Sequence, residues 1–166
     1  HVLMENGDSL MTIPVGEPPH ATQSGVIVPH PGNSNLYYIF SVPCMWVSPA
    51  ADMYFKYAIV DMSMNSGIGK VILKKKQINT YKATERITAV FHSNQRDIWV
   101  INHEDNSSRF RSYLVTTTGI DTLNPVVSTI GATSSGNCNM GCLKASPDGR
   151  KLAMAFWCNA STSHFE

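Results

Sequence analysis

The feature that most constrains this fold is a short pattern that occurs three times. In each copy, a turn of small and polar residues leads into an apolar run. The three turns span residues 31–35, 93–97 and 147–151. The runs begin at Leu36, Ile98 and Leu152, so the copies are 62 and 54 residues apart. A strand-like segment precedes each turn, so each copy predicts a β-hairpin. A hairpin repeated every ~40 to 60 residues is typical of a radial or solenoid array.

The intervals between the copies supply further strands. The first unit offers four strand-like segments, at 25–30, 36–42, 55–61 and 71–78, and the second offers four at 87–92, 98–103, 110–117 and 126–130. Four antiparallel strands per repeat is the composition of a propeller blade. The second strand of each unit is apolar nearly throughout, which predicts neighbouring sheets on both of its faces. The outer strands alternate and should be half exposed, and helix should be scarce. We therefore expect an all-β fold: a partial β-propeller with about two complete four-stranded antiparallel blades and part of a third.

The expected blade boundaries follow from these strands. The units cover residues 22–80, 84–131 and 142–166, and residues 1–21 are predicted to be the tail end of a preceding unit. The chain starts at His1 and stops at Glu166 soon after the third turn, so we expect it to be an arc of a larger propeller. An arc leaves apolar blade faces uncovered. We expect the remainder of its own propeller, or other copies of the chain, to cover them.

Composition argues against two classes of partner. The net charge is +1 and only 15% of residues are charged, so there is no electrostatic reason to expect nucleic acid or an anionic membrane. Lys74, Lys75 and Lys76 form a basic cluster after an apolar run, and we interpret it as a strand-edge guard rather than a binding patch. No apolar stretch reaches the ~18 residues of a membrane helix, so no membrane insertion is expected.

An ordered series of five stretches, at residues 22–29, 35–40, 84–90, 97–104 and 145–153, carries a resemblance to a known family. The series resembles the N-terminal WD40-like β-propeller region of large secreted Bacteroidetes surface proteins, which include type 9 secretion sorting-domain and gliding-motility-associated proteins. The resemblance covers nearly the whole chain. It implies an extracellular or cell-surface location and a scaffold for adhesion to protein or glycan. It carries no established catalytic residue onto this sequence.

The four cysteines permit two disulfides, with three possible pairings among Cys44, Cys138, Cys142 and Cys158. An oxidising cell surface would favour pairing. Cys138 and Cys142 form a C-x3-C pair without a second pair at zinc-like spacing. We expect a local disulfide or two free thiols there, rather than a metal half-site.

Motifs for catalysis and cofactor binding are missing from the sequence. Residues 67–70 (GIGK) lack the spacing and the Ser/Thr of a phosphate loop, and we expect a turn between the third and fourth strands. There is no G-x-S-x-G, no H-E-x-x-H and no Asp-rich calcium loop. We predict no catalytic residues, no metal and no cofactor.

Two sets of residues are the best candidates for binding. His103, Glu104 and Arg109, with Asp105 and Arg111, form the richest polar cluster, although a solvated hairpin explains them as well. The second set is the aromatic segment 44–57, with Trp46, Tyr54 and Phe55, because loops on a rigid scaffold carry recognition.

His30 and His92 stand at equivalent places before the first two turns. We expect them to cap those turns with a ring nitrogen, with a ligand role as the alternative.

Three function classes remain open. The first is a non-catalytic cell-surface or secreted module that binds protein or carbohydrate. The second is part of a propeller-type glycan-acting hydrolase or lyase, which would need inward-facing carboxylates or histidines from several blades. The third is a structural spacer in a large surface protein. Five acidic residues could serve the second class, namely Asp52, Asp61, Glu85, Asp97 and Glu104, and the sequence does not assign them inward or outward.

Overall fold

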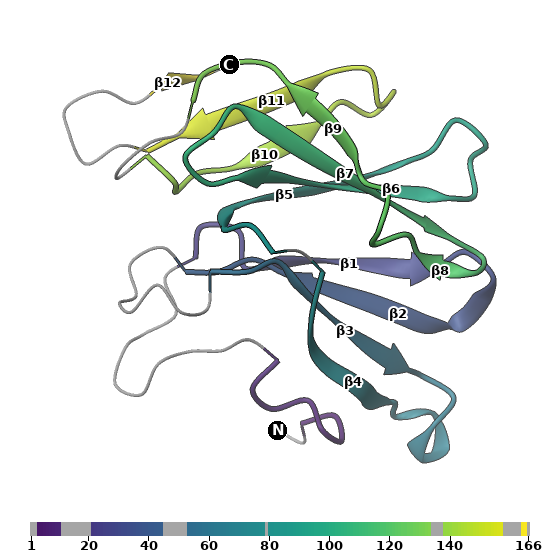
Figure 1. The fold of residues 1–166 in the computed structure, drawn as a ribbon. Helices are drawn as coiled ribbons and strands as arrows, with labels where there is room; N and C mark the ends of the chain where they lie inside the picture. The colour runs from purple at the N-terminus through teal and green to yellow at the C-terminus, as the bar shows by residue number, and fades with distance from the viewer. Residues whose placement is uncertain are drawn as a thin grey trace.

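The computed structural model describes residues 3–10, 21–44, 53–78, 80–133 and 138–157, and the backbone of residues 164 and 165. Its described part is an all-β fold of three antiparallel sheets (Figure 1). Helix in this part is limited to one 3-10 turn, Asn65–Gly67, between the third and fourth strands, where the sequence predicted a turn. No helix of the described residues has the length and apolar character needed to cross a membrane.

The first sheet is a four-stranded meander in sequence order. Its strands are β1 (Gly25–His30), β2 (Asn33–Ser41), β3 (Lys56–Asp61) and β4 (Lys70–Gln77). All four strands were predicted, with boundaries within three residues of those observed. The polar turns and the apolar runs that follow them therefore report the strand order of this sheet correctly.

The second sheet repeats the meander, except that two short strands, instead of one, pair with its third strand. Its strands are β5 (Ala83–Phe91), β6 (Ile98–Glu104), β7 (Arg109–Thr116), β8 (Gly119–Ile120) and β9 (Val126–Thr129). Both β8 and β9 pair with β7, β8 at Val115 and Thr116 and β9 at residues 109–112. The sequence predicted four strands here and missed the two-residue β8.

The third sheet is short in the described residues. It contains β10 (Leu143–Ala145), β11 (Leu152–Phe156) and β12 (His164–Phe165), in that order. The third repeated turn joins β10 to β11, as predicted.

The three sheets are stacked face to face, with the second between the other two (Figure 1). Ile98 and Val100 of β6 pack in one cluster with Val28, Tyr38 and Phe40 of the first sheet. The next side chains along β6 point the opposite way, and Ile101 packs with residues of the third sheet: Leu143, Met154 and Phe156. This two-sided burial confirms the expectation for the second strand of the middle unit.

His30 and His92 cap their turns, as predicted. The backbone N–H of Gly32 donates to His30 Nδ1 at 3.0 Å, and that of Asn94 donates to His92 Nδ1 at 3.2 Å. Each imidazole also lies beside an aromatic ring of the next strand, with centroids 5.6 Å apart for His30 and Tyr38 and 5.8 Å apart for His92 and Trp99. The first two units thus repeat a side-chain arrangement as well as a strand order.

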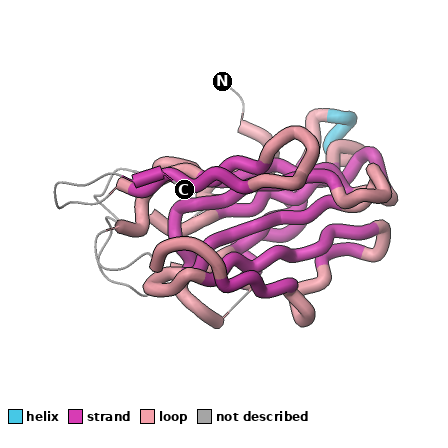
Figure 2. The backbone as a smooth tube through the Cα atoms, turned by 90° about the horizontal axis from the view of Figure 1, so that it is seen from above, coloured by secondary structure: helices cyan, strands magenta, loops and turns pink. Residues whose placement is uncertain are grey.

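The connections gather at two ends of the sheets (Figure 2). At one end, the backbone N–H of Asp105 donates to Lys82 O, that of Ala83 donates to Met53 O, and that of Glu85 donates to Asn139 O. We call this the loop end, because the connections between sheets meet the β2–β3 and β6–β7 connections there. The repeated tight turns lie at the opposite end, the turn end.

Candidate functional site

The loop end brings part of the predicted polar cluster together. Glu104 accepts hydrogen bonds from both neighbouring arginines: Arg111 donates from Nε at 3.0 Å and from Nη2 at 2.8 Å, and Arg109 donates from Nη1 at 3.3 Å. The Arg111 guanidinium also lies 4.3 Å from the ring centroid of Tyr81. Glu104 and Arg111 are therefore fixed against the connection between the first two sheets.

Exposure separates the members of this cluster. The Arg109 side chain is 52% exposed, whereas those of Arg111 and Glu104 are 21% and 13% exposed. Only the Arg109 guanidinium combines a long contact to Glu104 with wide access to solvent. Among the three, Arg109 is the group best placed to meet an external ligand.

His103 does not join this cluster. It is buried, and its ring lies edge-on to Phe110 with the centroids 4.7 Å apart. Burial, and secondarily the positive charge of Arg86, lowers the pKa of His103 to about 4. Successive side chains of a strand point to opposite faces, so Glu104 points away from His103 although they are neighbours in the sequence.

The three aromatic candidates do not form one surface in the described residues. Trp46 lies outside the described residues. Tyr54 is half-buried. Phe55 is buried and stacks on Phe40 with centroids 5.7 Å apart. Phe55 is therefore part of the core between the first two sheets and is not available to a ligand.

A buried polar network at the loop end was not predicted. Glu85 and Arg86 open β5 and are both fully buried. Glu85 Oε2 accepts from the backbone N–H of Thr22 at 2.7 Å and from its hydroxyl at 2.8 Å. Arg86 Nη2 donates to the carbonyls of Cys138 and Met140, the latter at 3.0 Å, and its guanidinium lies 4.5 Å from the ring centroid of Phe156. Burial lowers the pKa of Arg86 to about 10, so it is still charged at neutral pH.

Gln23 ties the start of the first sheet to both other sheets. Its Oε1 accepts from the backbone N–H of Leu143 at 2.7 Å and from that of Ile87 at 3.2 Å, and its Nε2 donates to the Leu143 carbonyl at 3.3 Å. Asn102 completes this layer by donating to the Arg86 carbonyl at 2.9 Å. One sequence signal was available: polar residues occur at 22–23, just before β1, and at 84–86, in the first half of β5.

The acidic residues suggested for catalysis also hold local partners. Asp97 accepts from Arg96 Nε at 2.9 Å and from Asn94 Nδ2 at 2.8 Å. Asp61 accepts from the backbone N–H and the hydroxyl of Ser63. Asp52 lies outside the described residues. The described members of this set are thus distributed over separate turns and networks.

The cysteines depart from the prediction. Cys138 is disulfide-bonded, whereas Cys142 and Cys44 are free thiols. A disulfide between Cys138 and Cys142, and two free thiols at these positions, were therefore both wrong, and Cys158 lies outside the described residues. Within the described ranges, no three His, Cys, Asp or Glu side chains come together as a metal site.

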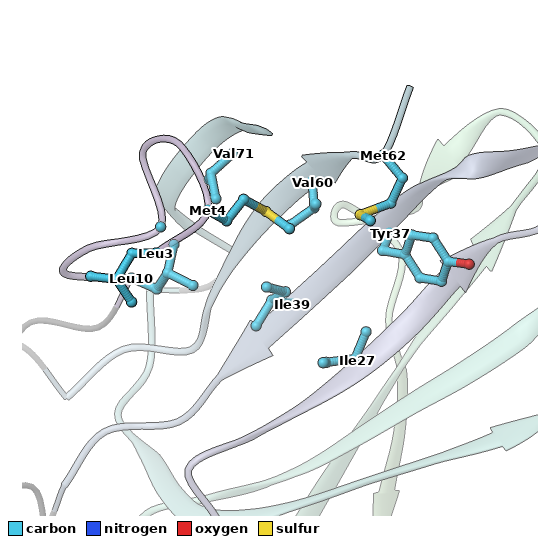
Figure 3. Close-up of a pocket in the computed structure, with 10 residues that line it drawn as sticks. Leu3, Met4, Leu10, Ile27, Tyr37, Ile39, Val60, Met62 and Val71 are labelled. Atoms are coloured by element: carbon cyan, nitrogen blue, oxygen red, sulfur yellow. The ribbon is translucent and has the colours of Figure 1, made fainter. Parts of the chain in front are cut away.

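An apolar groove of about 390 Å³ lies on the face of the first sheet that points away from the second (Figure 3). Strand side chains form its floor and the N-terminal segment forms one wall. Its lining includes Met4, Leu10, Ile27, Tyr37, Ile39 and Val60. Sequence reasoning predicted an uncovered apolar blade face but did not place this groove.

Comparisons of the chain with protein-family models, with curated proteins and with solved structures found no match. The described residues form three features that bear on function. They are an exposed arginine above a fixed ion pair at the loop end, a buried network that joins three sheets, and an apolar groove.

Proposed function

We propose that the chain is part of a β-propeller that acts as a non-catalytic binding scaffold for protein or glycan at a cell surface or in a secreted protein. Three successive antiparallel meanders packed face to face support the propeller architecture. The network of Gln23 supports it further, because it joins β5 and β10, the first strands of the second and third sheets, and the first strands of propeller blades lie together near the axis.

The burial and exposure of the side chains at the loop end support a binding role rather than a catalytic one. Four ionisable side chains of this end, Glu85, Arg86, His103 and Glu104, are buried or held by partners within the fold. A general acid or base must reach its substrate, and these groups are instead used to fix the sheets. Among the described residues of the predicted cluster, Arg109 is the side chain that this end presents most openly to solvent, on a rigid support.

The resemblance of the sequence to secreted surface proteins supports the proposed location. The disulfide at Cys138 supports it independently, because disulfides form and persist in oxidising compartments.

A glycan array tests the binding role. The purified chain should bind a subset of glycans saturably, and Arg109→Ala should weaken that binding by about tenfold, the loss expected when one charged hydrogen bond is removed. Arg150→Ala is the matched control, because Arg150 is an exposed arginine at the turn end. Its binding should equal that of the unmodified chain.

The other outcomes discriminate the remaining classes. Release of shortened glycans, detected by mass spectrometry, would overturn the non-catalytic role in favour of a glycan-acting enzyme. If neither the array nor crosslinking to isolated cell-surface proteins shows saturable binding, the scaffold role is wrong and the structural-spacer role replaces it.

A further inference from the structure

Within the described residues, the stack of three sheets has one face at each of its ends that no other sheet covers. The leading face is the side of the first sheet that points away from the second, and it carries Ile27, Tyr37, Ile39 and Val60. The trailing face is the side of the third sheet that points away from the second, and it carries Lys144, Ala153, Ala155 and Trp157.

The leading face is apolar and open in its centre. Ile27 is 66% exposed, and Tyr37 and Ile39 lie beside it along the sheet (Figure 3). The N-terminal segment covers the part of the face nearest β4. Its Glu5 carbonyl accepts from the Val71 N–H at 3.0 Å, and its Met4 and Leu10 pack against the sheet.

The trailing face carries smaller side chains than the leading face, apart from Trp157 and Lys144. Its side chains include two alanines, of which Ala153 is exposed, and Trp157, which is 41% exposed. Leu143 and Met154 point to the opposite side and pack on the second sheet.

Corresponding residue pairs show what kind of surface each face is. The leading face contains the cross-strand pair Ile27 and Ile39. The corresponding pair in the second sheet is Ala89 and Val100, three residues before His92, and it packs toward the first sheet. The pair in the third sheet is Leu143 and Met154, which packs toward the second. In both later sheets, this position is covered by the preceding sheet.

The trailing face contains the cross-strand pair Lys144 and Ala153. Its counterparts in the first two sheets are Val28 with Tyr38 and Val90 with Trp99. Each counterpart packs toward the following sheet. The trailing face is therefore the surface type that covers a leading face, and this contact already occurs twice within the chain.

We propose that the leading face of one copy of the chain binds the trailing face of a second copy, so that the stack continues from one molecule into the next. The small alanines of the trailing face can approach the larger Ile27, Tyr37 and Ile39 closely, and Trp157 adds an aromatic contact. The contact is heterologous, because the two copies contribute different surfaces. It depends on the sheet packing in the structure and not on the binding function proposed above.

Light scattering during size-exclusion chromatography tests the proposal. The mean mass of the purified chain should rise with concentration. Ile27→Lys and Trp157→Lys should each hold the chain as a monomer at concentrations where the unmodified chain associates. Ile72→Lys is the matched control, because Ile72 is also an exposed isoleucine of the first sheet but does not line the groove. It should associate like the unmodified chain.

Mixing the two variants separates a head-to-tail contact from any other. The Ile27→Lys chain retains its trailing face and the Trp157→Lys chain retains its leading face, so the mixture should form dimers that contain one copy of each. Circular dichroism checks that each variant is folded, and Ala153→Lys replaces Trp157→Lys if the latter is not.

A monomer at all concentrations, association unaffected by Ile27→Lys, or a mixture that does not form dimers would each overturn the proposal.

Discussion

Individual side chains in this protein take their roles from the strand face on which they lie. His103 and Glu104 are adjacent in β6, yet one is buried against Phe110 and the other pairs with two arginines. Glu85 and Arg86 are adjacent in β5, and they bind different segments, Thr22 and the carbonyls of residues 138 and 140. A polar cluster read from the sequence is thus divided by the two-residue alternation of a strand.

The buried imidazole of His103 predicts a loss of stability in acid. Its folded pKa of about 4 lies below the ordinary value of 6.5, so the unfolded chain binds more protons between these limits. The free energy of unfolding should therefore fall as the pH drops below 6.5, by about 2 kcal/mol at pH 5 and about 3 kcal/mol in full. Urea titrations at pH 7 and at pH 5 measure it.

His103→Gln is the control for this effect, because glutamine does not titrate. Burial raises the pKa of Asp105, which acts in the opposite direction on acidification, and the charge of Arg86 is constant in this range. The difference between the two chains therefore isolates the histidine. An equal pH dependence in both would show that His103 does not titrate differently on unfolding.

Sequence reasoning found the contacts within turns and missed those between sheets. The ring nitrogens of His30 and His92 bond two residues ahead, so the local sequence is enough to predict them. Glu85 binds Thr22, 63 residues away, and Arg86 binds Cys138, 52 residues away. The polar residues at 22–23 and 84–86 are visible in the sequence, but no local pattern reports which distant segment will cover a side chain, so their partners could not be predicted.

At the scale of elements, the described strands follow from turn residues and apolar runs, because both signals are local. The missed strand β8 has two residues and follows the polar run Thr116, Thr117 and Thr118, so it has no apolar pattern of its own. The outer position of the second sheet is divided because β7 pairs with β9 at its start and with β8 at its end.

The attachment of β10 depends on the amide of Gln23. Gln23→Ala leaves the Leu143 and Ile87 N–H groups without this acceptor, which should lower the free energy of unfolding by about 2 kcal/mol. Hydrogen exchange followed by mass spectrometry should show faster exchange in β10. Ser24→Ala, at an exposed neighbour, should change neither quantity. Unchanged exchange in β10 after Gln23→Ala would show that the strand is held by its apolar contacts alone.

For the whole molecule, the apolar packing of the described sheets is nearly one-dimensional, because the first sheet packs on the second and the second on the third. Hydrogen bonds of Thr22 and Gln23 at the loop end also join the start of the first sheet to the third. Stability in such an array is approximately a sum over neighbouring interfaces. Phe40 belongs to the first interface and Phe156 to the second, and both are buried. The two phenylalanines therefore offer a matched pair of probes for how the sheets cooperate.

Phe40→Leu and Phe156→Leu should each destabilise the chain by about 1–2 kcal/mol through lost contacts and residual cavity. Hydrogen exchange should distinguish them. Phe156→Leu should accelerate exchange in β10 and β11 and leave β1 to β4 protected, because the third sheet can open without disturbing the first interface. Phe40→Leu should accelerate exchange in β1 to β4, where it removes a ring stacked on Phe55. If both variants accelerate exchange equally in all three sheets, the stack unfolds as a single cooperative unit and the nearest-neighbour description is wrong.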